Sequence, residues 1–189
     1  MIADRQEAGQ TKAPRAIAAA LAALALLVTL APVAARAGLA DGKFKVGDRA
    51  PDFTLNDTRG RPVSLAATTT KGAVLLAFWA MRCGTCLSEI PYLEQIKAKY
   101  EGKGMTLLAV NTDGVDAPTV AATLKDLKLA PSYTILLDPD FVVSDTYTNF
   151  VVPLTLIIDR AGIVRYTHTG FEEGSEKEYE QALLAAIGP

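Results

Sequence analysis

The chain has 189 residues, half of them hydrophobic, and a formal net charge of -2. This length and composition allow one sizeable hydrophobic core and give no sign of a second. Nucleic-acid binding needs a basic surface that a nearly neutral chain lacks. The charge balance therefore excludes nucleic acid as an expected partner.

The first part of the chain has the three successive regions of a secretory signal. Three basic residues come first: Arg5, Lys12 and Arg15. An uncharged run rich in alanine and leucine follows over 16–35, and the small-residue pattern Ala35-Arg36-Ala37 ends it. We therefore predict a signal peptide over 1–37 and one domain over 38–189. A run of roughly 20 apolar residues is also just long enough for an uncleaved membrane anchor. Either interpretation places the domain outside the cytoplasm, in a periplasm or an equivalent compartment.

The first half of the predicted domain contains patterns for a hairpin, a buried strand and a helix. Two short alternating runs within 53–65 flank turn residues, as in a hairpin. The continuous apolar run 73–80 has the length of a strand that is buried on both faces. After it, an apolar stripe predicts a helix that begins near the cysteines, with Pro91 expected to kink it. The stripe consists of Leu87, Ile90, Leu93, Ile96 and Tyr100.

The second half continues the alternation of strands and helices. Residues 105–112 have the pattern of another buried strand, and Asp116 can cap a helix that runs to Leu127. Three more strands and a closing helix are predicted at 133–138, 154–159, 163–168 and 175–187. This order predicts an α/β fold with a central mixed sheet and helices on both faces, the parallel part first and an antiparallel hairpin last.

The two cysteines, Cys83 and Cys86, are separated by Gly84 and Thr85. A structural staple that closes so small a ring would stabilise the domain by only about 2 kcal/mol, and a domain of this size does not need one. A metal site usually takes three or four ligands, and the single imidazole belongs to His168. A copper or zinc site made by the two thiols and His168 stays open at this point, although an ordinary position at the end of a strand is the simpler interpretation.

A redox role for the cysteine pair has positive support. The pair lies where a buried strand passes into a helix, so Cys83 is expected at the helix N-terminus. Free N–H groups and the helix dipole there favour a thiolate and lower the pKa of that thiol, which makes Cys83 the expected nucleophile. Cys86, one turn further on, suits the resolving role. An extracytoplasmic location agrees with this chemistry, because disulfides are formed and exchanged there.

Three segments carry motifs that occur together, and in this order, in one known family. They are VGDRAPDFTLNDTRGRPVSL (46–65), FWAMRCGTCLSEIP (78–91) and VVPLTLIIDRAGIVRYTHTG (151–170). They resemble, respectively, the N-terminal extension, the active-site signature and the cis-proline segment of the TlpA/ResA-like (CcmG/DsbE-like) thioredoxin-fold proteins. The resemblance runs from about residue 46 to the C-terminus. It implies a thioredoxin fold with an N-terminal β-hairpin extension and thiol-disulfide oxidoreductase activity without a metal or other cofactor.

The resemblance also implies roles for individual residues. Cys83 matches the attacking cysteine and Cys86 the resolving one, together a redox-active disulfide. Pro153 matches the cis-proline beside the sulfurs, where it and Val152 would expose backbone for an extended substrate. Glu89 matches an acid near the active site that raises thiol pKa values or accepts a proton from Cys86. An alternative is that Glu89 only supports the helix dipole.

Four positions near the cysteines depart from the family pattern or tune the site. Arg82 replaces the usual tryptophan before the first cysteine, and we expect its charge to stabilise the Cys83 thiolate. Thr85 replaces a common proline, and with Gly84 it contributes to setting the reduction potential. Ala77 stands where thioredoxin has a buried acid, so that proton route is absent.

The expected partners are protein thiols and disulfides. The resemblance implies apocytochromes c or copper-site assembly proteins as clients and a membrane thiol-disulfide donor as the source of electrons, with the chain acting as a monomer. Two alternatives remain. One is a peroxiredoxin-like peroxidase, although Ala80 stands where that class usually has threonine. The other is a Sco-like copper-binding assembly factor, which would need His168 and usually has a longer cysteine spacing.

Overall fold

The computed structural model describes residues 42–188, and these form a seven-stranded sheet with helices on both faces. The predicted signal peptide over 1–37 lies outside the described residues. The strands are β1 (Thr54–Asp57), β2 (Pro62–Ser64), β3 (Ala73–Trp79), β4 (Met105–Asn111), β5 (Thr134–Leu137), β6 (Leu154–Ile158) and β7 (Val164–Thr169). The helices are α2 (Leu65–Thr69), α3 (Gly84–Tyr100), α4 (Ala117–Asp126), α5 (Val142–Thr148) and α6 (Glu176–Ile187).

The sheet is mixed, with the strand order β2-β1-β5-β4-β3-β6-β7. Strands β3, β4 and β5 are parallel to one another, whereas β6 is antiparallel to β3 and β7 to β6. The predicted order of a parallel part followed by an antiparallel hairpin is therefore confirmed. The predicted N-terminal hairpin is β1 and β2, and it extends the sheet by pairing β1 antiparallel to β5.

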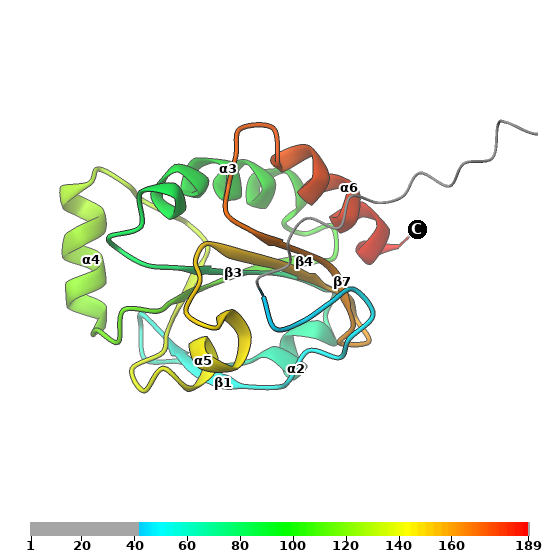
Figure 1. Cartoon of the computed structure of the whole chain (residues 1–189), viewed down its shortest axis with the longest axis horizontal. Coiled ribbons are helices and arrows are strands. Elements are labelled where there is room, and N and C mark those ends of the chain that lie inside the picture. Colours follow the sequence, from blue (N-terminus) through cyan, green and yellow to red (C-terminus); the bar gives the residue numbers. More distant parts are fainter. Residues whose placement is uncertain (1–41, 189) are drawn as a thin grey trace, which may run out of the picture. The chain divides into compact units, whose positions relative to one another are not determined.

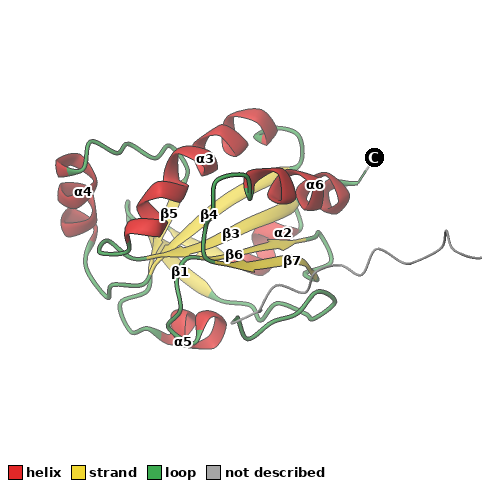
Figure 2. Cartoon of the chain, turned by 45° about the horizontal axis from the view of Figure 1, so that its top comes forward, coloured by secondary structure: helices red, strands yellow, loops and turns green. Residues whose placement is uncertain are grey.

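The helices form two layers around the sheet (Figure 1). Helices α3 and α6 cover one face, and α2 and α5 lie on the other. Figure 2 shows the strands fanning out between these layers. The sequence patterns missed α2 and α5, which have only 5 and 7 residues. Helices this short are held by their tertiary contacts and carry no repeating apolar stripe.

The central strand β3 contributes side chains to both cores, because successive residues of a strand point to opposite faces. Leu75, Ala77 and Trp79 pack in the core beneath α3 and α6. Val74, Leu76 and Phe78 pack in the core beneath α2 and α5. All seven residues of β3 are buried, as the continuous apolar run predicted.

Two aspartates close the hairpins at either end of the fold. The Asp57 carboxylate accepts hydrogen bonds from the N–H groups of Arg59 and Arg61, at 2.8 and 2.9 Å. The Asp159 carboxylate accepts in the same way from Ala161 and Ile163, both at 2.9 Å. An aspartate that bonds the backbone just after it is a known way to fix a tight turn.

Helix α3 buries four residues of the predicted stripe, and the fifth, Leu87, is half-buried against the same core. Its inward face carries Ile90, Leu93, Ile96 and Tyr100, and the helix continues through Pro91. No helix among residues 42–188 has both the length and the apolar character needed to cross a membrane.

Because Leu76 is fully buried in β3, we expect Leu76→Ala to lower the free energy of unfolding by about 2–5 kcal/mol through lost burial and a cavity. Leu184→Ala is the matched control, since that side chain on α6 is 55% exposed, and it should change stability by less than about 1 kcal/mol. Urea unfolding of both variants measures the difference. Equal losses would contradict the central position of β3.

Candidate functional site

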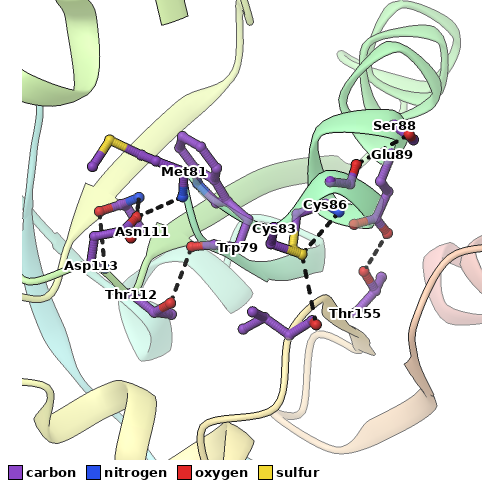
Figure 3. Close-up of a disulfide and its surroundings, with 12 residues drawn as sticks. Trp79, Met81, Cys83, Cys86, Ser88, Glu89, Asn111, Thr112, Asp113 and Thr155 are labelled. Carbon is purple, nitrogen blue, oxygen red and sulfur yellow. Dashed lines mark hydrogen bonds between the residues drawn. A yellow bond between two sulfur atoms is a disulfide. The ribbon is translucent and has the colours of Figure 1, made fainter. Parts of the chain in front are cut away.

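The two cysteines form a disulfide where β3 passes into α3. Cys83 is the N-cap of α3, with extended backbone angles, and its Sγ accepts a hydrogen bond from the N–H of Cys86 at 3.1 Å. The two sulfurs are bonded at 2.08 Å (Figure 3). The sequence placed Cys83 at the start of this helix, and the structure confirms that position.

The two sulfur-bearing residues differ in exposure. Cys86 is 1% exposed and belongs to the core beneath α3, whereas Cys83 is half-buried at the edge of that core. A thiol at position 83 can therefore meet a macromolecular disulfide, whereas a thiol at position 86 is shielded from one. This asymmetry matches the expected attacking and resolving roles.

A second chain segment, the loop before β6, lies against Cys83. The Val152–Pro153 peptide bond is cis, as the resemblance implied. The Val152 carbonyl oxygen lies 3.8 Å from Cys83 Sγ, within reach of a thiol proton. Val152 is half-buried and Pro153 is buried, so the backbone offered beside the sulfur is that of Val152.

Glu89 is buried beneath α3 and is not an exposed residue of its first turn. It is 1% exposed, and its Oε1 accepts hydrogen bonds from the Thr155 hydroxyl at 2.8 Å and the Tyr179 hydroxyl at 2.9 Å. Burial raises the pKa of Glu89 to about 7, and the two hydrogen bonds oppose this rise because they favour the carboxylate. The interpretation of Glu89 as a helix-dipole residue alone is therefore wrong.

The three residues around Cys83 that face solvent are Arg82, Gly84 and Thr85. Among the described residues, no hydrogen bond or ion pair engages the Arg82 guanidinium. Its charge is thus free to act on the neighbouring sulfur or on a partner. Gly84 has open space where a Cβ would stand, so this position is also accessible.

Sequence reasoning missed the residues that support the site from neighbouring strands. Asp113 Oδ2 accepts hydrogen bonds from the Met81 N–H at 2.8 Å and from Asn111 Nδ2 at 2.7 Å, which holds the loop before Cys83 (Figure 3). A signal existed for Asp113, because it directly follows a buried parallel strand and such strand ends gather at one edge. Thr155 and Tyr179 carried no comparable signal.

His168 lies on β7, where its cross-strand partner is Thr155 and its ring is 6.0 Å from that of Tyr179. Among residues 42–188, no group of three or more His, Cys, Asp or Glu side chains is placed to hold a metal ion. The three-ligand copper or zinc site of Cys83, Cys86 and His168 is therefore not formed in the described part of the chain.

The burial of Glu89 predicts a pH-dependent stability. Between the ordinary glutamate pKa of 4.5, which applies to the unfolded chain, and about 7 in the folded protein, the folded state holds one proton more than the unfolded state. Stability therefore falls as pH rises through this interval, by about 3 kcal/mol in total. Glu89→Gln keeps the acceptor oxygen but has no proton to lose, so its stability should gain about that amount over the wild type between pH 5 and pH 8.

Urea unfolding of the oxidised proteins at these two pH values measures the effect. Glu173→Gln, which replaces an exposed carboxyl, is the matched control and should follow the wild type. A stability difference between Glu89→Gln and wild type that is the same at both pH values would contradict a raised Glu89 pKa.

Comparison with known proteins agrees with this geometry. Residues 46–167 match the AhpC/TSA family. The chain is 30% identical over 141 residues to the thiol-disulfide oxidoreductase ResA of Bacillus thuringiensis subsp. konkukian, covering 75% of this chain and 78% of that protein. It is 34% identical over 125 residues to ResA of Geobacillus thermodenitrificans, covering 66% of this chain and 70% of that protein.

A solved structure supports the same assignment. The crystal structure of a protein described as a putative thiol:disulfide interchange protein DsbE from Chlorobium tepidum superposes with a TM-score of 0.69 at 34% sequence identity. The match covers 77% of this chain and 99% of that one. The expected thioredoxin fold and thiol-disulfide oxidoreductase activity are thereby confirmed. The chain belongs to the AhpC/TSA family and, with ResA and DsbE as its relatives, to the thioredoxin-fold thiol-disulfide oxidoreductases.

Proposed function

We propose that this oxidoreductase works outside the cytoplasm as a reductant of protein disulfides, with Cys83 as the nucleophile and Cys86 as the resolving thiol. The observation that carries the proposal is the disulfide between a half-buried cysteine at the N-cap of α3 and a buried one a turn inside it. This arrangement lets the first sulfur meet a client while the second is kept from it.

The helix start accounts for the reactivity of Cys83. Its sulfur already accepts the N–H of Cys86 at 3.1 Å, and the positive end of the helix dipole lies there. Both interactions favour a thiolate over a thiol. Arg82 directly precedes Cys83 in sequence, and its exposed guanidinium adds a positive charge of the same effect.

The reaction is an exchange of two disulfides. The Cys83 thiolate attacks one sulfur of the client disulfide, a mixed disulfide forms, and the other client sulfur leaves as a thiolate. The Cys86 thiol then gives up its proton and attacks Cys83 Sγ, which expels the second client thiolate and forms the Cys83–Cys86 disulfide. The client gains two electrons and the enzyme loses two.

Glu89 is the proposed acceptor of the Cys86 proton. It lies three residues after Cys86 on α3, so the two side chains share one buried face of the helix. Its pKa of about 7 suits a group that takes up and releases a proton near neutral pH.

The proposed compartment and the proposed partners rest on the sequence and on the relatives of the chain. The pattern of basic residues, apolar run and small-residue cleavage site at 1–37 supports export, and the DsbE-like and ResA-like relatives are thiol-disulfide exchange proteins by their descriptions. A membrane thiol-disulfide donor would restore the dithiol after each cycle. Apocytochromes c and copper-site assembly proteins are the proposed clients.

The roles of the cysteines predict opposite outcomes for two serine variants. Reduced wild-type protein should reduce insulin disulfides, and Cys83→Ser should fall to the uncatalysed rate because it lacks the nucleophile. Cys86→Ser keeps the nucleophile but cannot resolve the mixed disulfide, so it should accumulate a covalent adduct with insulin. Turbidity and non-reducing mass spectrometry measure these outcomes. Wild-type activity no higher than that of Cys83→Ser would contradict the proposal.

A charge effect of Arg82 on the sulfur predicts the behaviour of the reduced protein. Arg82→Trp, which places an uncharged ring there, should raise the pKa of Cys83 and slow its alkylation by iodoacetamide below that pKa about 1.5- to 5-fold, the scale of one exposed charge. Arg82→Lys keeps the charge and should behave as wild type. An alkylation profile unchanged in Arg82→Trp would show that the guanidinium acts on partners and not on the thiol.

A further inference from the structure

The carboxyl group of Glu89 is held by two hydroxyl groups from different elements. The Thr155 hydroxyl comes from β6 and the Tyr179 hydroxyl from α6, and both donate to the same oxygen, Oε1. Tyr179 and Thr155 are each 0% exposed. Figure 3 shows the Glu89 side chain pointing from α3 toward Thr155, on the side of the helix where the disulfide lies.

The two carboxyl oxygens therefore differ. Oε1 accepts both hydroxyl donors, whereas Oε2 accepts no hydrogen bond from the described residues. An oxygen that already accepts two hydrogen bonds has its lone pairs engaged, so an added proton goes to the other oxygen. The proton of Glu89 is thus carried by Oε2.

We propose that Thr155 and Tyr179 are positioning residues for the resolving step: by holding Oε1, they leave Oε2 as the atom that exchanges a proton with Cys86. This inference rests on the proposed function, and in particular on Glu89 as the proton acceptor. It adds two residues outside the cysteine helix to the reaction, one of them on the last helix of the chain.

The surroundings of Glu89 are buried and contain no opposing charge. None of the salt bridges among the described residues involves Glu89. Cys86 precedes it on α3, and Tyr179 faces it from α6. The Tyr179 ring packs against Tyr166 and His168 of β7, with centroids 5.6 and 6.0 Å apart. Burial is the largest cause that raises the pKa of Tyr133, just before β5, and the charges of Glu94 and then of Glu89 add to it.

Within this cluster the hydroxyl donors are the groups that favour the charged carboxylate. Each donor lowers the pKa of Glu89 against the effect of burial. The loss of one donor should therefore make Glu89 hold its proton to a higher pH, and Cys86 would lose its acceptor at neutral pH.

The step balances in protons and electrons. The Cys86 S–H bond breaks, its proton goes to Oε2, and the sulfur forms the bond to Cys83 Sγ. The bond between Cys83 and the client sulfur breaks, and the client leaves as a thiolate. Glu89 then releases the proton to water and is ready for the next cycle.

The two steps of the exchange can be observed separately when a small aromatic disulfide serves as the substrate. Reduced full-length protein is mixed in a stopped-flow instrument with dithiobis-nitrobenzoate, whose thiolate product is coloured. The first release of colour follows the attack by Cys83 and depends on reagent concentration. The second release follows resolution by Cys86 and does not depend on it. The rate of the second phase is recorded as a function of pH.

The wild-type second phase should accelerate as Glu89 loses its proton. Tyr179→Phe removes one donor and should move the midpoint of this profile up by about one pH unit, so that the second phase slows about tenfold below the midpoint. Thr155→Val should act in the same direction, and Thr155→Ser, which keeps the hydroxyl, should restore the wild-type profile. The first phase should be unchanged in all three variants.

Tyr147→Phe is the matched control. Tyr147 is 1% exposed and its hydroxyl donates to the Pro51 carbonyl, so the variant also loses a hydrogen bond of a buried tyrosine, one that is partly buried and belongs to the other core, beneath α2 and α5. It should lower the stability and leave both phases unchanged. Glu89→Gln should abolish the midpoint altogether.

The outcomes distinguish the inference from the proposed function. Absence of the first phase in the wild type would overturn the thiol exchange itself. With a normal first phase, an unmoved midpoint in Tyr179→Phe and Thr155→Val would overturn the positioning role and leave the function standing. A midpoint that survives in Glu89→Gln would overturn both the acceptor role of Glu89 and the inference.

Discussion

The site depends on the antiparallel pairing of β6 with β3. Phe78, near the end of β3, is the cross-strand partner of Leu154, the first residue of β6. Because the two strands run in opposite directions, the residues after the end of β3 and those before the start of β6 meet at one edge of the sheet. Cys83 and Val152, 69 residues apart in sequence, come within 3.8 Å there. A parallel β6 would have carried the cis-proline loop to the far edge.

The same pairing explains how the chain provides a buried acid without one at position 77. Ala77 and Thr155 are cross-strand partners, and cross-strand partners point to the same face of the sheet. Thr155 donates a hydrogen bond to Glu89 of α3. The Glu89 carboxyl is therefore bound at the strand position that pairs with the small residue Ala77. A buried carboxyl thus reaches this part of the sheet from helix α3 and not from β3 itself. Its burial costs free energy that the hydroxyls of Thr155 and Tyr179 offset in part.

Most of the fold could be predicted because each large element carries its own local pattern. Several features depend only on residues that are close in sequence: the buried strand β3, the stripe of α3, the Asp116 cap of α4 and the two turns closed by aspartates. The short helices α2 and α5 were missed because too few residues repeat. The two hydroxyl groups that bond Glu89 were missed because Thr155 and Tyr179 are 66 and 90 residues away from it in sequence. The hydrogen bond from Met81 to Asp113 was missed because those residues are 32 apart.

The sequence by itself determined that Cys83 starts a helix after a buried strand and that Cys86 follows one turn later, because strand burial, helix periodicity and cysteine spacing are local properties. It also determined, through its three motifs, the family to which these residues belong. Only the tertiary structure decided that Glu89 points inward, that two hydroxyls from β6 and α6 hold one of its oxygens, and that Arg82 stays unpaired among the described residues. The direction of a side chain on a helix depends on what packs against that helix, and this is fixed when distant segments meet.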